Sequence, residues 1–146
     1  MTNEWMPRRT GTHQDHVIAH VLGATVLGYF EADDALHFSL DIDFIWTIFP
    51  DAEMGLLPQS LALRELNLTD EERARLKDDL RRLDEANGDA EIFARITRAP
   101  AGCLVEEVLL LARDEMLRLE IQGEKAALVV EASPLTGEMT VGRLEV

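Results

Sequence analysis

Residues 36–49 read LHFSLDIDFIWTIF, and this stretch decides the fold. Every even-numbered position carries a large apolar side chain, from Leu36 to Ile48. The odd-numbered positions are mixed and include His37, Asp41 and Asp43. An apolar period of two is typical of a β-strand with one face in a hydrophobic core. We therefore expect one long amphipathic strand, whose register is set because a slip of one residue would bury two aspartates.

The chain before this strand is less regular. Residues 1–12 are polar and show no periodicity, so we expect a loosely held N-terminal arm followed by a single domain over 13–146. Residues 17–30 are apolar and rich in β-branched side chains, and Gly23 and Gly28 disfavour a helix. This composition favours one strand, or two with a bulge at Gly23, although the choice between helix and strand for 16–30 stays open.

Two helices are expected after the strand. A short one is expected near residues 59–66. Thr69 and Glu72 then have the spacing of a capping box, which predicts a helix from Asp70 to about Ala86 that stops at Asn87-Gly88. Its apolar side chains form a single narrow stripe, so the helix should lie across the sheet. The stripe consists of Leu76, Leu80 and Leu83, and the expected ion pairs are Glu71–Arg75 and Asp78–Arg82.

The C-terminal part has the turn spacing of a strand meander. Turn residues recur at 113–115, 122–124 and 133–137, a spacing typical of consecutive strands. Residues 92–97 fit a further strand, Gly142 fits a bulge, and 104–119 fits either a helix or a hairpin. The sequence as a whole predicts an α+β fold. It should be a single domain with one antiparallel sheet of about six or seven strands and a helical insertion packed on it.

Composition excludes several classes of protein. The 146 residues contain 28 acidic and 14 basic side chains, a net charge of −14 that would repel a nucleic-acid backbone. The longest uncharged apolar run, 17–30, is shorter than the roughly 20 residues that span a bilayer, so we expect no membrane insertion. A lone cysteine, Cys103, excludes an intrachain disulfide and fits a reducing, cytoplasmic location. In its apolar context we expect a buried, inert thiol.

The charge is unevenly distributed. Residues 10–63 contain no Lys or Arg, eight acids and all four histidines. Three of these, His13, His16 and His20, would share one face of a helix and could then bind Zn²⁺ or another divalent metal. On a strand only His16 and His20 would share a face. Since the flanking sequence favours a strand, we expect isolated imidazoles in preference to a metal site. No cofactor is therefore expected.

A second set of polar residues lies on the period-two segment itself. His37, Asp41 and Asp43 share one face and, beside Trp46, could form a ligand site. His37, Ser39 and Asp41 resemble a catalytic triad only in composition, because neighbours along one strand face stand side by side and do not converge. Phosphate-loop, dinucleotide, zinc-protease and serine-hydrolase motifs are absent from the sequence. An enzyme is therefore not the leading expectation.

The remaining candidates are apolar residues that could be exposed after the strand: Phe49, Met54, Leu56 and Leu57. Such a patch indicates association with another protein. The leading hypothesis is thus an acidic protein that acts through protein–protein contacts, as a homodimer and as an inhibitor or chaperone of a basic protein. The alternative is a small-molecule-binding or enzymatic domain, possibly metal-dependent, with a His and Asp site on the N-terminal sheet segment.

Overall fold

The structure is a computed structural model that describes residues 4–85, 95–100 and 102–144. It contains two five-stranded antiparallel sheets and three helices. The expected α+β class with antiparallel pairing is confirmed, but the expectation of one sheet of six or seven strands is wrong. The elements are β1 (Met6–Pro7), α1 (Thr12–Val21), β2 (Val26–Ala32), β3 (Ala35–Leu40), β4 (Phe44–Ile48), β5 (Met54–Pro58), α2 (Gln59–Glu65), α3 (Asp70–Glu85), β6 (Thr97–Arg98), β7 (Val105–Arg113), β8 (Met116–Gly123), β9 (Ala127–Ala132) and β10 (Met139–Leu144).

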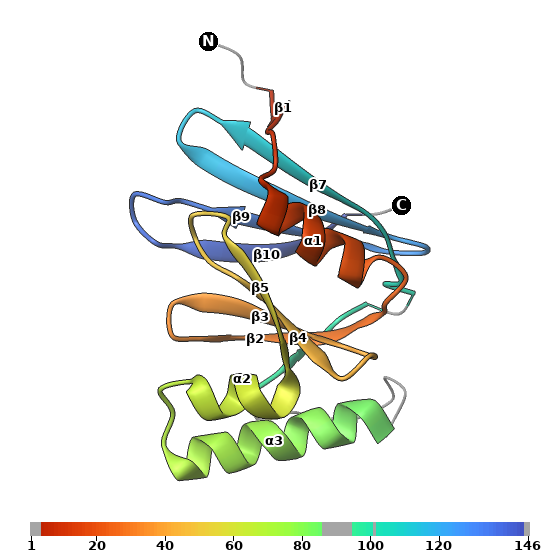
Figure 1. Ribbon diagram of the computed structural model, residues 1–146, viewed down its shortest axis with the longest axis vertical. Helices are drawn as coiled ribbons and strands as arrows, with labels where there is room; N and C mark the ends of the chain where they lie inside the picture. The colour runs from red at the N-terminus through yellow and green to blue at the C-terminus, as the bar shows by residue number, and fades with distance from the viewer. Residues whose placement is uncertain (1–3, 86–94, 101, 145–146) are drawn as a thin grey trace.

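The elements form three layers. One sheet has the strand order β1-β7-β8-β9-β10, and the other has the order β5-β4-β3-β2-β6. The two sheets face each other, and α2 and α3 cover the outer side of the second sheet (Figure 1). Helix α1 lies beside the edge strand β5 and closes one side of the sandwich. The sheet that contains β3 is therefore covered on both faces.

The segment expected to be one long strand is a hairpin. Strands β3 and β4 pair antiparallel, with Phe38 opposite Trp46, and Asp41, Ile42 and Asp43 make the turn. A three-residue turn places even-numbered residues opposite even-numbered ones, so the apolar alternation runs through it unbroken. Asp43 has φ +61°, a left-handed conformation that Asp tolerates at the end of such a loop. Periodicity alone could not reveal the turn.

The even-numbered face of this hairpin builds the core between the sheets. Phe38 is fully buried, and its ring lies 5.7 Å from those of Tyr29 and Trp46 on the two neighbouring strands. Trp46 Nε1 is buried there with no hydrogen-bond partner among the described residues. Leu119, Ile121, Leu128 and Val130 of the facing sheet complete this core. Most of the stabilisation of the sandwich is expected from this apolar burial.

Residues 12–21 form a helix, so the preference for a strand over this part of 17–30 is wrong. Val17 and Val21 turn into the sandwich core, while Gln14 Oε1 accepts from Gly11 N and its Nε2 donates to Ala52 O at 2.7 Å. Tertiary contacts thus override the weak helix propensity of the β-branched residues. Gly23, with φ +86°, follows the helix and is not a bulge.

The second helical region agrees with the sequence. Helix α3 begins at Asp70, and Thr69 and Glu72 form the expected reciprocal capping box. Its stripe of Leu76, Leu80 and Leu83 is buried against the sheet. Glu71 pairs with Arg75 at 2.7 Å, as expected, and Asp78 pairs with Arg81 at 2.7 Å. The predicted stop at Asn87-Gly88 lies outside the described residues.

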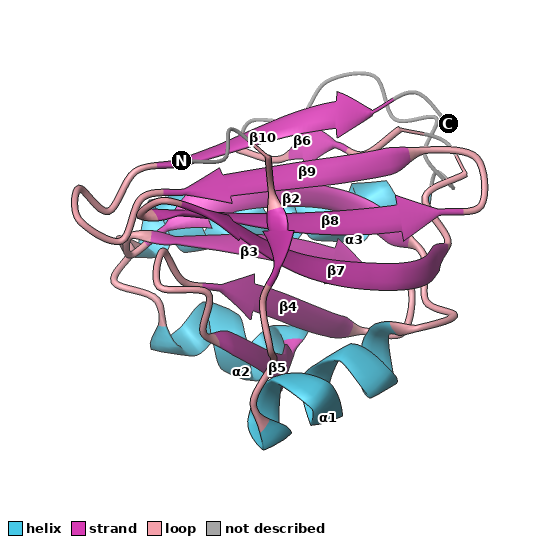
Figure 2. Ribbon diagram, turned by 90° about the horizontal axis from the view of Figure 1, so that it is seen from above, coloured by secondary structure: helices cyan, strands magenta, loops and turns pink. Residues whose placement is uncertain are grey.

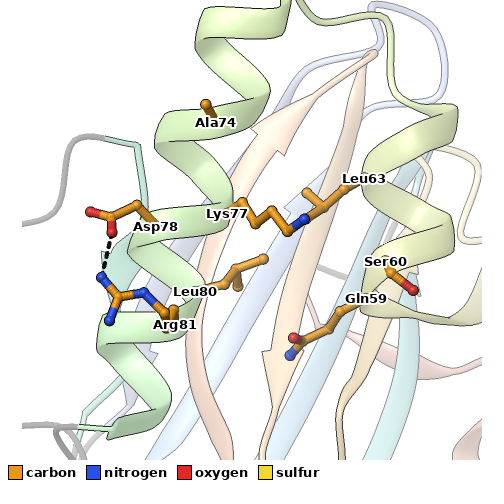
Figure 3. A pocket seen from close by; sticks show the side chains of 8 residues that line it. All are labelled: Gln59, Ser60, Leu63, Ala74, Lys77, Asp78, Leu80 and Arg81. Atoms are coloured by element: carbon orange, nitrogen blue, oxygen red, sulfur yellow. Dashed lines mark hydrogen bonds and ion pairs between the residues drawn. The ribbon is translucent and has the colours of Figure 1, made fainter.

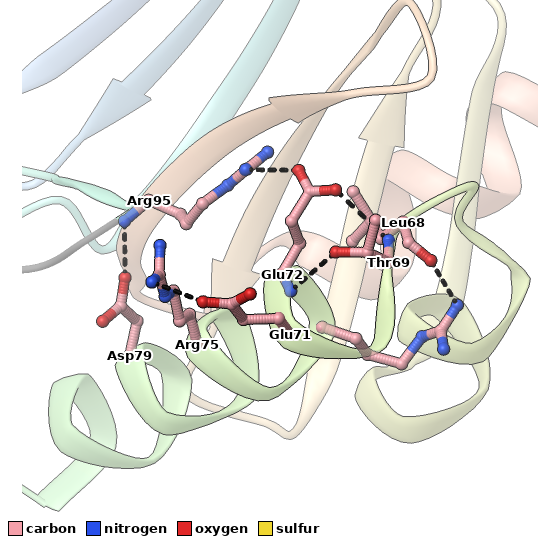
Figure 4. A network of polar contacts seen from close by, with 8 residues as sticks. Leu68, Thr69, Glu71, Glu72, Arg75, Asp79 and Arg95 are labelled. Carbon is pink, nitrogen blue, oxygen red and sulfur yellow. Dashed lines mark hydrogen bonds and ion pairs between the residues drawn. The ribbon is translucent and has the colours of Figure 1, made fainter.

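Helix α3 is also tied to the chain segment that returns to the sheet. The buried carboxylate of Asp79 accepts from the backbone N–H of Arg95 at 2.7 Å, and the Arg95 guanidinium donates to Glu72 at 2.8 Å (Figure 4). Hydrogen bonding to Thr69 and then to Arg95 lowers the pKa of Glu72. The helix is therefore held against β2 at both its start and its middle.

The C-terminal turns lie where the sequence predicts them. Residues 104–119, for which helix and hairpin were both open, form part of the β7–β8 hairpin. The pairing of β9 with β10 runs without a register shift through Gly142, so the bulge expected there is wrong. Of the strand expected over 92–97, residues 92–94 lie outside the described part, and β6 covers Thr97–Arg98.

The N-terminal arm is attached to the sandwich from Trp5 onward. The guanidinium carbons of Arg113 and Arg118 lie 4.5 and 5.5 Å from the centroid of its indole ring, and β1 pairs with β7. Among the described residues, no helix combines the length and apolar character needed to cross a membrane.

Gly28 allows α3 to approach β2. A methyl group there would lie 2.7 Å from Ile96 and 2.9 Å from Leu83, whereas one at Gly142 would meet nothing within 4 Å. We predict that Gly28→Ala lowers the free energy of unfolding by about 1–3 kcal/mol through overpacking. Gly142→Ala, also within a strand, should have an effect of less than about 0.5 kcal/mol. Urea denaturation measures both, and equal effects would contradict the close packing of α3 on β2.

Candidate functional site

A cavity of about 420 Å³ lies on the outer face of the β5-β4-β3-β2 sheet, beside α2. The odd-numbered residues of the β3–β4 hairpin point to this side, and α2 and α3 cover only part of it. The lining is mainly apolar. It consists of His13, Asp33, Ala35, His37, Thr47, Phe49, Gly55, Leu56, Leu57, Ala62, Glu65 and Leu66. An apolar cavity with a few polar groups is the usual form of a binding site.

The floor of the cavity contains a hydrogen-bonded pair, His37 and Thr47. These residues lie opposite each other on β3 and β4, and both are buried. Thr47 Oγ1 lies 2.9 Å from His37 Nδ1, and His37 Nε2 lies 3.0 Å from the carbonyl oxygen of Ala32. The imidazole also stacks on Phe30, with ring centroids 4.9 Å apart. The ring is therefore held in one orientation.

These contacts define the tautomer of neutral His37. A carbonyl oxygen only accepts, so Nε2 carries the hydrogen and donates it to Ala32. Nδ1 is then an acceptor and receives the hydroxyl hydrogen of Thr47. Burial lowers the pKa of His37, an effect partly offset by the Ala32 carbonyl and by the charge of Asp33. Neutral His37 is consequently the form that this environment favours near neutral pH.

The β2–β3 turn places an acid at the rim. Asp33 and Asp34 form a two-residue turn between the paired Ala32 and Ala35, with φ of +53° and +58°. Two positive φ values define the type I′ turn that suits a tight hairpin. Asp33 Oδ2 accepts from the backbone N–H of Asn67 at 2.7 Å, which joins this turn to the chain after α2.

The surroundings of the cavity are strongly acidic. Two further hollows adjoin it: one shares Ala35 with the cavity, and the other shares Asp33 and Phe49. Among the described residues that line the three hollows there is no Lys or Arg. Seven are acidic, and we call them the acidic surface: Glu31, Asp33, Asp34, Asp51, Glu53, Glu65 and Glu138. Such a surface attracts cations and repels anions.

The structure separates the four residues expected to form a ligand site. His37 lines the cavity, but Trp46 lies on the opposite face of the sheet, inside the sandwich, because it pairs with Phe38. Asp41 and Asp43 are exposed in the β3–β4 turn, where Asp41 Oδ1 accepts from Thr25 N. The side chains of these four residues therefore do not converge.

The histidines of α1 lie on the helix that a three-histidine metal site requires. His13 Nε2, however, lies 2.9 Å from the carbonyl oxygen of Met54, and His20 Nδ1 lies 2.8 Å from that of His16. In the described part of the chain, no group of three or more His, Cys, Asp or Glu side chains is placed to hold a metal ion. The structure thus gives no support to the proposed zinc site.

Three of the four apolar interaction candidates line the cavity. Phe49 is exposed at its rim and Leu57 is half-buried in its wall, whereas the side chain of Leu56, which pairs with Trp46, packs against the sandwich core. Met54 is 2% exposed and points into the sandwich core, so its assignment to a surface is wrong. Analysis of the sequence missed the contribution of Thr47 and Glu65. Thr47 could have been inferred from its place on the same face as His37, but Glu65 depends on the position of α2.

A separate groove of about 550 Å³ lies between α2 and α3 (Figure 3). Lys77 extends from α3 toward α2, and Arg81 pairs with Asp78 at 2.7 Å. The polar groups of Lys77, Asp78 and Arg81 are exposed. With no buried polar group among its described lining residues, this groove offers less chemical selectivity than the cavity beside His37.

Comparison of the chain with protein-family models, with curated proteins and with solved structures finds no match.

His37 should make stability depend on pH. Its folded-state pKa lies below its ordinary value of 6.5, so the unfolded chain takes up this proton first as the pH falls. The contribution of neutral His37 to the free energy of unfolding is fully present above about pH 6.5. It decreases as the pH falls from there to the folded-state pKa. We predict that in His37→Gln the free energy of unfolding, measured by urea titration, decreases less between about pH 7 and about pH 5 than in the original chain. An unchanged slope would contradict this, and His16→Gln, at an exposed position, is the control.

Cys103 should be unreactive in the folded protein. The side chain is fully buried, as expected from its sequence context, and burial raises the pKa of its thiol to about 11. Because the thiolate is the reactive form, a thiol reagent near neutral pH should label Cys103 only after unfolding. Mass spectrometry with and without urea measures this. Rapid labelling of the folded chain would contradict the buried position.

Proposed function

We propose that this protein binds a basic protein partner through the acidic surface. The observation that carries the proposal is the juxtaposition of seven carboxylates, without Lys or Arg in the described lining, around an apolar cavity. Like charges at this density repel one another, and a basic partner relieves that repulsion. Electrostatic complementarity of this kind accelerates association and selects among partners.

The acidic surface is discontinuous in sequence but local in space. Its members lie in the end of β2 and the following turn, the β4–β5 loop, the β9–β10 loop and the end of α2. Figure 2 shows the strands running across the molecule with loops at both ends. Glu138 follows β9, whereas Glu124 precedes it, so these two acids lie at opposite ends of the same strand. Acids near Glu124 therefore provide a control for net charge.

An inhibitor or chaperone of a basic protein is the role that fits this surface. Both roles need a complementary contact and no reacting group on the binding protein. The two ring nitrogens of His37 are occupied by Thr47 and Ala32, which leaves neither free to accept a proton from a substrate. Homodimer formation remains a separate prediction that light scattering can test.

A second candidate is the binding of a small apolar molecule, because the cavity beside His37 is mainly apolar and about 420 Å³ in volume. Free indole and tryptamine are suitable probes. A change in the Phe49 and Leu57 NMR signals on adding either compound, with no binding of basic peptides, would favour this candidate.

The binding proposal is tested with a fluorescein-labelled peptide of alternating lysine and serine. Neutralising Asp34, Glu53 and Glu138 as Asn, Gln and Gln should weaken binding roughly tenfold at low salt. Neutralising Glu106, Glu107 and Glu124 as Gln changes the net charge equally but should have less than about a twofold effect. Fluorescence anisotropy measures both affinities. Equal losses in the two triple variants, or no binding by the original chain, would contradict the proposal.

A further inference from the structure

We propose that the cavity beside His37 binds a tryptophan side chain within the basic segment of a partner, and that a proton on His37 opposes this binding. The inference rests on the proposed function and specifies its partner. It follows from three properties of the cavity: the polarity of its floor, the charge of its rim and the connection between His37 and Thr47.

The floor presents a hydrogen-bond acceptor. Ala35, His37, Thr47 and Ala62 are its buried members. With His37 neutral, Nε2–H is used by Ala32 and the Thr47 hydroxyl hydrogen is used by Nδ1. Thr47 Oγ1 then retains a lone pair and has no hydrogen left to give. A ligand group with a hydrogen-bond donor at its tip would therefore complement this floor.

The donor should be neutral and should stand on an apolar body. Leu57 and Leu66 form apolar walls, and the carboxylates of Asp33 and Glu65 are on exposed residues at the rim. A cation at the floor would lose its hydration without a carboxylate beside it, which is unfavourable. The indole of tryptophan has a large apolar surface and a single N–H, which only donates. It therefore fits both the walls and the floor.

The rim selects the residues that flank the tryptophan. Asp33 and Glu65 line the mouth of the cavity, and the acidic surface continues around them. Lysine or arginine on either side of the anchor would meet these carboxylates. The exposed ring of Phe49 at the same rim adds an aromatic surface against which the indole can pack.

Protonation of His37 reverses the polarity of the floor. A protonated Nδ1 donates to Thr47 Oγ1, so the hydroxyl hydrogen turns away and toward the cavity. The floor then offers a donor and a positive charge to an occupant that is itself a donor. The titratable groups that face His37 among the described lining residues are Asp33 of the turn, Glu65 of α2 and His13 of α1. The contribution of these three groups to the pH dependence of binding must be separated from that of His37.

The test uses short lysine-rich peptides that differ at one central residue: tryptophan, 1-methyltryptophan, phenylalanine or alanine. Tryptophan should bind about fivefold more tightly than 1-methyltryptophan near pH 7.5, the effect of one neutral hydrogen bond. This ratio should fall toward one as the pH is lowered and His37 takes up a proton. The ratio cancels the titration of the acids, because both peptides carry the same lysines.

Two substitutions at one position provide the matched variants. Thr47→Val removes the hydroxyl with little change in shape and should abolish the preference for tryptophan over 1-methyltryptophan. Thr47→Ser keeps a hydroxyl and should retain the preference. Thermal melting first establishes that both variants are folded, and His37→Gln should remove the pH dependence of the ratio.

The outcomes separate this inference from the proposed function. Salt-dependent binding of all four peptides with equal affinity would overturn the tryptophan site and leave the basic partner in place. A preference that persists in Thr47→Val, or that does not change with pH, would also overturn it. Failure of every peptide to bind would overturn both proposals.

Discussion

The burial of β3 on both faces is the constraint on which the structure depends. All six of its residues are buried. On one side Leu36, Phe38 and Leu40 form the core between the sheets, and the other side carries His37 and Ser39. Buried polar groups require partners, which Thr47, the Ala32 carbonyl and Gln59 provide. The same strand therefore requires a second sheet on one side and helices on the other.

The candidate site exists because the helical cover is incomplete. Helices α2 and α3 bury Ile45 and Phe30 but leave the strand ends near Thr47 and Phe49 beside a cavity. The tight turn at Asp33-Asp34 and the loops after β4 and β9 bring acids to this opening. Apolar lining, a fixed polar pair and one sign of charge thus occur together. This combination is the basis of the proposed partner binding, and both ring nitrogens of the buried His37 are already engaged within the chain.

Local signals were the most reliable guides to the fold. The Thr69–Glu72 capping box and the leucine stripe of α3 depend on residues close in sequence, and the structure reproduces both. The helix over 12–21 was missed, because its stability comes from Val17 and Val21 in the sandwich and from the Gln14 contact with Ala52. The β3–β4 turn was missed because a three-residue loop preserves the alternation. His37, Phe49, Leu56 and Leu57 were identified as candidates in separate groups, without a sign that they line one cavity.

The amino-acid sequence by itself determined the α+β class, the capped helix and the confinement of fixed positive charge to residues outside 10–63. These properties follow from composition and from interactions between near neighbours in the chain. Tertiary structure alone decided that there are two sheets, that Trp46 and His37 lie on opposite faces, and that acids from four separate segments line three adjoining hollows. The physical reason is that strand pairing and helix docking join residues far apart in sequence, and an alternating pattern does not specify which strands meet.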